Sequence, residues 1–185
     1  MKAGVLALQG DFREHARVLA DLGVSPLEVR TADDLARVDC LVIPGGESTT
    51  ITKLARSEGL VEPIRERAAG GMPMLGTCAG MIVMAMRIEG GEPLLRLVDV
   101  TVRRNAYGRQ VDSFEADVDV KGIDHPVRAI FIRAPWVEDV GSRVRVLAEH
   151  EGRPVVLEQG NLVVASFHPE LAGETRLHEY VLRKA

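Results

Sequence analysis

The 185-residue sequence has only two cysteines, no long hydrophobic run and no strong excess of one charge. Cys40 and Cys78 lie far apart and form no C-x-x-C pair, which argues against a disulfide scaffold or a cysteine-based zinc site. We therefore expect a reducing, cytoplasmic setting. The apolar run within MKAGVLALQGD is too short for a secretion signal, and no later stretch reaches the length of a membrane span. We expect neither secretion nor membrane insertion.

Other classes of protein are disfavoured by composition. The net charge of -4 argues against a general nucleic-acid binder or a protein drawn to acidic membranes. The five histidines show no H-x-x-x-H or clustered spacing, so a metal enzyme is the weakest interpretation, and we predict no metal and no cofactor. No repeat or linker divides the chain. At this length folding buries roughly 70% of the surface, and we predict a single domain over residues 1–185.

The N-terminal half alternates strand-like and helical segments. Continuous apolar runs typical of buried strands occur at residues 5–8, 26–29, 40–43 and 73–75. Helical spacing is found at residues 12–23, 31–38, 50–59 and 61–71. Thr31 is the expected N-cap of the second of these helices. Such alternation implies crossover connections, so we predict an α/β fold: a mostly parallel, flavodoxin-like sheet flanked by helices in three layers.

Beyond Gly91 the pattern becomes mostly strand-like. The strand-like segments occupy residues 94–104, 109–120, 127–134 and 144–167. Turn signals, EGR at 151–153 and QGN at 159–161, interrupt the last of them. We therefore predict additional antiparallel strands in the C-terminal half. Apolar residues at helical spacing then predict a closing helix within residues 173–184.

Residues 76–80, GTCAG, fit the nucleophile-elbow pattern G-x-S-x-G with a cysteine in the serine position. The pattern follows a strand-like run and precedes a helical one, and its glycines permit a tight turn without Cβ clashes. Cys78 would then project from the carboxyl edge of the sheet, where α/β folds place ligands. The N-terminus of a helix would favour its nucleophilic thiolate. An inert, buried cysteine in an elbow-like turn would give the same short pattern.

The segment FHPEL, residues 167–171, directly follows the strand-like NLVVASF. Pro169 disfavours a helical backbone at His168, so we predict an extended segment in which His168 and Glu170 face the same side. A histidine that takes a proton from Cys78 and a carboxylate that supports the histidine would complete a Cys–His–Glu triad. The alternative is a loop at a strand end with a solvated histidine and glutamate.

The segment PGGEST, residues 44–49, follows the buried strand-like run CLVI. Two glycines at a strand end let backbone N–H groups point into a cavity, as acyl transfer requires where a tetrahedral oxyanion forms. We predict the backbone N–H groups of Gly46 and Ala79 as the oxyanion donors. A phosphate-binding loop is the rival interpretation, but the G-x-x-x-x-G-K-[ST] spacing and its lysine are absent.

Taken in order, PGGEST, GTCAG and FHPEL resemble the triad-type, class I glutamine amidotransferases. GTCAG and H-P-E are shared across that superfamily. VLALQG at 5–10, GGEST at 45–49 and RNAYGRQVDSFE at 104–115 more specifically resemble the glutaminase subunits of pyridoxal phosphate synthases. The resemblance extends from the first strand to near the C-terminus. It implies the class I glutamine amidotransferase fold and the hydrolysis of L-glutamine to L-glutamate and ammonia.

The resemblance also implies a role for each matching residue. Cys78 would attack the carboxamide carbon of glutamine and form a thioester, with His168 relaying protons and Glu170 supporting the histidine. The residues that would bind glutamine are Gly46, Glu47, Ser48, Arg104, Ile132 and Arg133. An arginine suits the α-carboxylate of glutamine, because its guanidinium donates two charge-assisted hydrogen bonds. A solvated arginine at a strand end would look the same in sequence, and Cys40 is expected only to pack.

The resemblance further implies a partner: a (β/α)₈-barrel synthase subunit that receives the ammonia through an internal path and forms pyridoxal phosphate. Docking would reorient the backbone around Gly45 and Gly46 and complete the oxyanion hole. His15 and Gln9 are expected near the partner or on a solvated helix face. Three alternatives stay open: the glutaminase subunit of another pathway, such as imidazole glycerol phosphate synthase; an α/β protein whose elbow cysteine senses oxidation; and a binding module without turnover.

Overall fold

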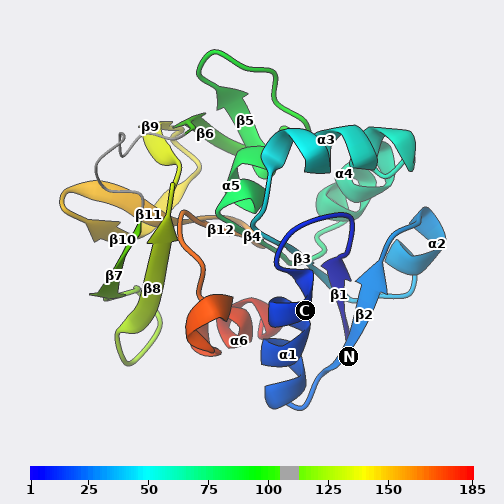
Figure 1. The fold of residues 1–185 in the computed structure, drawn as a ribbon, viewed down its shortest axis with the longest axis horizontal. Coiled ribbons are helices and arrows are strands. Elements are labelled where there is room, and N and C mark those ends of the chain that lie inside the picture. The colour runs from blue at the N-terminus through cyan, green and yellow to red at the C-terminus, as the bar shows by residue number, and fades with distance from the viewer. Residues whose placement is uncertain (105–112) are drawn as a thin grey trace.

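The computed structural model describes residues 1–104 and 113–185. Its largest element is a seven-stranded sheet with the strand order β10-β11-β12-β4-β3-β1-β2 (Figure 1). Its strands are β1 Lys2–Leu6, β2 Ser25–Val29, β3 Cys40–Ile43, β4 Met74–Thr77, β10 Arg145–His150, β11 Arg153–Gln159 and β12 Leu162–Ala165. The five strands from β12 to β2 pair in parallel, whereas β11 is antiparallel to both β10 and β12. The predicted α/β fold with a mostly parallel sheet is confirmed.

Helices cover both faces of this sheet. They are α1 Phe12–Asp21, α2 Ala32–Leu35, α3 Ser48–Ser57, α4 Val61–Ala69, α5 Ala79–Met84 and α6 Arg176–Leu182. Figure 1 shows α1 and α6 on one side of the sheet and α3, α4 and α5 on the other. Each face has its own buried hydrophobic cluster: Ile51 of α3 belongs to one, and Leu19 of α1 and Leu177 of α6 belong to the other. None of the described helices is long and apolar enough to cross a membrane.

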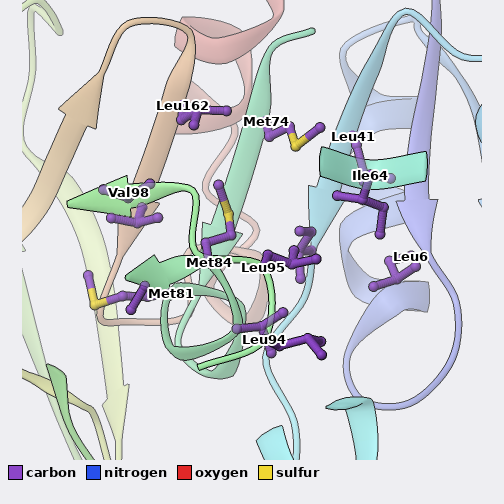
Figure 2. Close-up of a cluster of buried hydrophobic side chains, with 14 of the residues drawn as sticks. Leu6, Leu41, Ile64, Met74, Met81, Met84, Leu94, Leu95, Val98 and Leu162 are labelled. Carbon is purple, nitrogen blue, oxygen red and sulfur yellow. The ribbon is translucent and has the colours of Figure 1, made fainter. Parts of the chain in front are cut away.

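The cluster on the α3–α5 side determines where α5 lies. Figure 2 shows Ile64 of α4 and Met81 and Met84 of α5 beside Leu41 and Leu162 of the sheet. All five side chains are buried. Burial of a side chain of this size contributes roughly 1.5–3 kcal/mol. Because α5 begins directly after the predicted nucleophile, the apolar packing of this short helix also holds the elbow in place.

Two smaller sheets are built from the C-terminal half and the segment after α5. Their strands are β5 Ala85–Ile88, β6 Val98–Arg103 and β9 Trp136–Val140 in one, and β7 Ser113–Val118 and β8 Val127–Ile132 in the other. The pairs β6–β9 and β7–β8 are antiparallel, which confirms the expected additional antiparallel strands. Strands β5 and β9 were not predicted from the sequence. Both are short and only partly buried, so their local apolar pattern is weak.

Local signals in the sequence match most element boundaries. Thr31 caps α2 as predicted: its hydroxyl accepts from the Asp34 N–H, and the Asp34 carboxylate accepts from the Thr31 N–H. The turn signal EGR joins β10 to β11, with Glu151 and Gly152 both at positive φ. The first strand ends at Leu6, two residues earlier than expected, and the chain then reaches the end of β3, where the Asp11 N–H donates to the Gly45 carbonyl oxygen.

Candidate active site

Cys78 lies between β4 and α5 with a strained backbone, φ 49° and ψ -106°. Non-glycine residues rarely adopt positive φ, and such strain is typical of functional turns. The flanking glycines fit because they lack a side chain. A Cβ at Gly80 would lie 2.0 Å from the Ile43 carbonyl oxygen, and one at Gly76 would lie 2.9 Å from the backbone of Gly80. The tight turn predicted for GTCAG is confirmed, whereas the reactivity of Cys78 stays a prediction.

The structure brings His168 and Glu170 into contact, but by a different route from the one expected. The His168 N–H donates to the Ile130 carbonyl oxygen over 2.8 Å, and the chain then turns. Pro169 has helical angles, φ -67° and ψ -32°, and Glu170–Ala172 form a 3₁₀ turn, η1, so the predicted extended segment is wrong. The turn nevertheless places Glu170 Oε1 2.7 Å from His168 Nδ1. The side chains meet because the backbone curls, not because strand residues alternate.

A second carboxylate, which the sequence did not reveal, also faces His168. Asp11 Oδ2 lies 3.3 Å from His168 Nδ1. The Asp11 N–H donates to the Gly45 carbonyl oxygen over 3.2 Å, and a Cβ at Gly45 would lie only 2.3 Å from His168 Cε1. The position of Asp11 in the sequence could have indicated that it lies near Cys78. It follows the first strand of a parallel sheet and therefore belongs to the same carboxyl edge as Cys78.

The acidic surroundings of His168 control its protonation. Burial alone would lower the pKa of the imidazole, but side-chain hydrogen bonds with Asp11, Cys78 and Glu170 raise that pKa above its usual value. Burial raises the pKa of Glu170 in turn, and the hydrogen bond from His168 opposes that shift. The arrangement favours a proton on His168 at neutral pH. A histidine in this state is prepared to donate a proton to a leaving amine.

Removing the charge of Asp11 is expected to lower the pKa of His168. Because the hydrogen bond to Asp11 raises this pKa, the Asp11→Asn variant should lose the imidazolium proton at a lower pH than the unsubstituted protein. An NMR titration of the His168 ring protons would measure the shift. Asp21→Asn, at the exposed end of α1, is the matched control. Equal titration of His168 in all three proteins would contradict this role of Asp11.

A cavity of about 480 Å³ opens in front of Cys78. The predicted site residues that line it are Gly46, Glu47, Ser48, Cys78, Ala79, Arg104, Ile132, Arg133 and His168. Gln9, Asp11, Ile82 and Leu171 complete the lining. The volume suits a small-molecule ligand. Glu170 lies behind the cavity, buried against His168. Most of the RNAYGRQVDSFE motif, residues 105–112, lies outside the described residues.

Two backbone features place the end of β8 at this cavity. The Ile132 carbonyl oxygen lies 3.9 Å from Cys78 Sγ. Arg133 has a positive φ of 43°, which a non-glycine residue rarely adopts. Strain of this kind persists only where the surrounding structure enforces it, and it is concentrated at ligand sites. The structure thus brings the predicted Ile132–Arg133 pair next to the predicted nucleophile.

The Glu47 carboxylate caps α3 and is therefore not free in the cavity. It accepts from the backbone N–H groups of Thr49, over 3.1 Å, and Thr50, over 2.7 Å, and from both threonine hydroxyls. These hydrogen bonds lower the pKa of Glu47 to about 2. The Glu47 N–H donates to Gln9 Oε1 over 2.7 Å. Any contact of Glu47 with a ligand in this conformation would therefore come from its backbone rather than its carboxylate.

The capping role of Glu47 predicts a pH-dependent contribution to stability. Because folding depresses this pKa from 4.5 to about 2, the contribution is present above the unfolded pKa and is lost as the pH falls through the folded one. Glu47→Gln should cost about 1 kcal/mol near pH 7, the typical loss for a helix cap, and progressively less toward pH 2. Thermal unfolding of both proteins across this range measures the difference. A difference that does not change with pH would contradict the assignment.

Two further expectations have different outcomes. His15 is fully buried, so the expected solvated helix face is wrong for it, whereas its nearness to a partner stays a prediction. Gln9 lines the cavity and holds the Glu47 backbone. Among the residues that the structure describes, one group has metal-ligand spacing: Asp11, His168 and Glu170 place their ligand atoms within 4.8 Å of one another. The hydrogen bond between His168 and Glu170 and the ion pair between His168 and Asp11 already account for that proximity.

Comparison with solved structures defines the class of protein. A protein described as "Crystal structure of glutamine amidotransferase" matches with a TM-score of 0.94 and 46% identity, over 98% of this chain and 97% of the other. A second, described as "Structure of PurLQS from Thermotoga maritima", has a TM-score of 0.76 at 17% identity and shows the fold alone. The fold is that of the class I glutamine amidotransferases. Residues 5–185 match the SNO glutamine amidotransferase family, and the chain belongs to it.

Relatives of known name support the more specific resemblance. The protein named "Pyridoxal 5'-phosphate synthase subunit PdxT" in Acidothermus cellulolyticus is 55% identical, over 97% of this chain and 91% of the relative. The protein of the same name in Streptomyces avermitilis is 57% identical, over 95% of this chain and 89% of the relative. The resemblance inferred from the motifs is confirmed.

Proposed function

We propose that this chain is the glutamine-hydrolysing subunit of a pyridoxal phosphate synthase and acts as one glutaminase domain over residues 1–185. The observation that carries the proposal is the placement of Cys78. It lies on a strained elbow and shares a cavity with His168, whose Nδ1 is held by Glu170. The match to the SNO glutamine amidotransferase family supports glutamine as the substrate, and the relatives named as PdxT support pyridoxal phosphate synthesis as the pathway.

The proposed reaction proceeds through a thioester. The Cys78 thiolate attacks the carboxamide carbon of glutamine, and the bond to nitrogen breaks as His168 gives its proton to the leaving ammonia. Water then attacks the thioester and passes a proton to His168. The C–S bond breaks, which returns the Cys78 thiolate beside protonated His168, and the new carboxyl group leaves as glutamate after losing its proton to solvent. Glu170 keeps the imidazole oriented throughout, because its Oε1 lies 2.7 Å from His168 Nδ1.

Substrate binding is assigned to groups around the cavity. We assign to the backbone N–H groups of Gly46 and Ala79 the hydrogen bonds that stabilise the oxyanion formed on the substrate. The glutamine-binding groups are Ser48, Arg104, the backbone of Gly46 and Glu47, and the Ile132–Arg133 pair. Gly46 has φ +143°, and a Cβ there would lie 2.9 Å from the backbone Cα of Gly10, so this position requires glycine. An arginine at the cavity suits the α-carboxylate of an amino acid.

The partner proposed for this chain is a (β/α)₈-barrel synthase subunit that accepts the ammonia. Docking of that subunit would reorient the backbone around Gly45 and Gly46 and complete the oxyanion hole. Two contacts now hold this segment: the Asp11 N–H donates to the Gly45 carbonyl oxygen, and the Glu47 N–H donates to Gln9 Oε1. The cytoplasmic setting stays a prediction.

The test is glutamate release from glutamine by the purified chain, alone and with a cognate synthase subunit. We expect turnover to rise when the synthase is added. Activation by the cyclase subunit of imidazole glycerol phosphate synthase instead would support the other pathway. Glutamine binding without glutamate formation, even beside the synthase, would support a binding module. Unchanged Cys78 labelling by iodoacetamide in His168→Ala would support a cysteine that senses oxidation independently of the histidine.

A further inference from the structure

A buried polar chain extends behind the predicted catalytic glutamate. Glu170 Oε1 faces His168, and its other oxygen, Oε2, points away from the cavity. His15 Nε2 lies 3.3 Å from Oε2, and both side chains are completely excluded from solvent. No hydrogen bond of standard geometry reaches Oε2 from the described residues. His15 is therefore the side chain placed to satisfy this buried oxygen.

His15 is itself held by two further elements. Its Nδ1 lies 2.7 Å from His178 Nε2 on α6, and its Nε2 lies 3.0 Å from Thr77 Oγ1 at the end of β4. His178 and Thr77 are both buried. Thr77 directly precedes Cys78. The titratable groups that face His15 are thus Glu170 from η1, His178 from α6 and, farther off, His168.

His15 and His178 are both uncharged at neutral pH. Burial lowers the pKa of His15 well below its usual value, and the neighbouring His178 and His168 lower it further. Burial likewise lowers the pKa of His178 to about 4, against the influence of Glu174. A neutral imidazole has one N–H donor and one acceptor nitrogen. Each histidine in the row Glu170–His15–His178 can therefore donate a hydrogen bond to only one of its neighbours, so all the donors in the row point the same way.

The contacts indicate which direction that is. A buried carboxylate oxygen without a donor is costly, so we assign the hydrogen of His15 to Nε2, where it is shared between Thr77 Oγ1, at 3.0 Å, and Glu170 Oε2, at 3.3 Å. His15 Nδ1 then accepts from the Nε2–H of His178. In that arrangement His178 Nδ1 bears no hydrogen.

We propose that His15 is a positioning residue for the triad: its Nε2–H holds Glu170 Oε2, so that Oε1 stays aimed at His168, and His178 selects the tautomer. This inference rests on the proposed glutaminase function. Without His15, Glu170 Oε2 loses the N–H that faces it, and the carboxylate is free to rotate away from His168. His168 then loses its orientation. Misplacement of a reacting group by about 1 Å can cost on the order of 10²-fold in rate.

The experiment compares three variants in the glutaminase assay with the cognate synthase subunit. His15→Leu fills the space without a donor, and we expect kcat to fall on the order of 10²-fold with KM nearly unchanged. His15→Gln can place an amide N–H near the position of Nε2, and we expect it to restore most of kcat. Leu19→Ala, a buried position on the same helix, is the control for lost packing alone. It should lower Tm and leave kcat nearly unchanged.

Several results would overturn the positioning role. An active unsubstituted protein whose His15→Leu variant keeps the same kcat would do so. Equal impairment of His15→Leu and His15→Gln, in proportion to their loss of Tm, would do so as well. ¹⁵N NMR of the histidine rings in the unsubstituted protein needs no variant to fold, and a hydrogen on His15 Nδ1 rather than Nε2 would contradict the proposal. Absence of glutamate formation by the unsubstituted protein would instead contradict the proposed function.

Discussion

Replacement of Cys78 by alanine is expected to abolish glutamate formation, with a loss on the order of 10⁴-fold or more. The thioester cannot form without Sγ, and the remaining groups contribute only binding and oxyanion stabilisation. His168→Ala should cost nearly as much, because the two side chains act as one unit. The double variant should therefore be little worse than either single variant, which steady-state turnover in the presence of the synthase would measure.

The second cysteine provides the matched control. Cys40 lies on β3, is 1% exposed and has its pKa raised to about 11, mainly by burial and also by the charge of Asp39. Cys40→Ala should keep its turnover, and iodoacetamide should label Cys78 in preference to Cys40. Substantial glutamate formation by Cys78→Ala would exclude the thioester mechanism. Additive losses in the double variant would show that Cys78 and His168 do not act together.

Gly80→Ala is expected to disrupt both the fold and the activity. An added Cβ would lie 2.0 Å from the Ile43 carbonyl oxygen, and this neighbour is backbone, which a rotamer change cannot relieve. Helix α5 would have to move away from β3 and would carry Cys78 with it. Overpacking of this kind costs about 1–3 kcal/mol, and sometimes more. Chemical denaturation and turnover should therefore both show a large loss.

Gly70→Ala is the matched control for this substitution. Gly70 ends α4 with φ -73°, and the nearest atom to an added Cβ lies 3.4 Å away, an ordinary contact. Since φ is negative, alanine fits, and the reduced freedom of the unfolded chain could even stabilise the protein by about 0.4–1 kcal/mol. Native stability and turnover in Gly80→Ala would show that α5 tolerates a shift and that the elbow is not rigidly placed.

Local patterns in the sequence predicted the elements that position the site. The run CLVI became β3, the capping residue Thr31 begins α2, and GTCAG forms the turn between β4 and α5. These signals are local: continuous apolar runs, capping side chains and paired glycines act over a few residues. Strands β5 and β9 escaped prediction because their pairing partners, not their own residues, make them strands.

The sequence by itself determined that a cysteine elbow and a His–Glu pair would lie at the carboxyl edge of a parallel sheet. It did not determine how the pair would meet, because η1 depends on how the chain packs after β12. Nor did it place Asp11 beside His168 or His15 behind Glu170. Those contacts join segments distant in sequence, from the start of α1 to η1. The burial of α1 against one face of the sheet, where it packs beside η1, brings the paired atoms within 3.3 Å of each other.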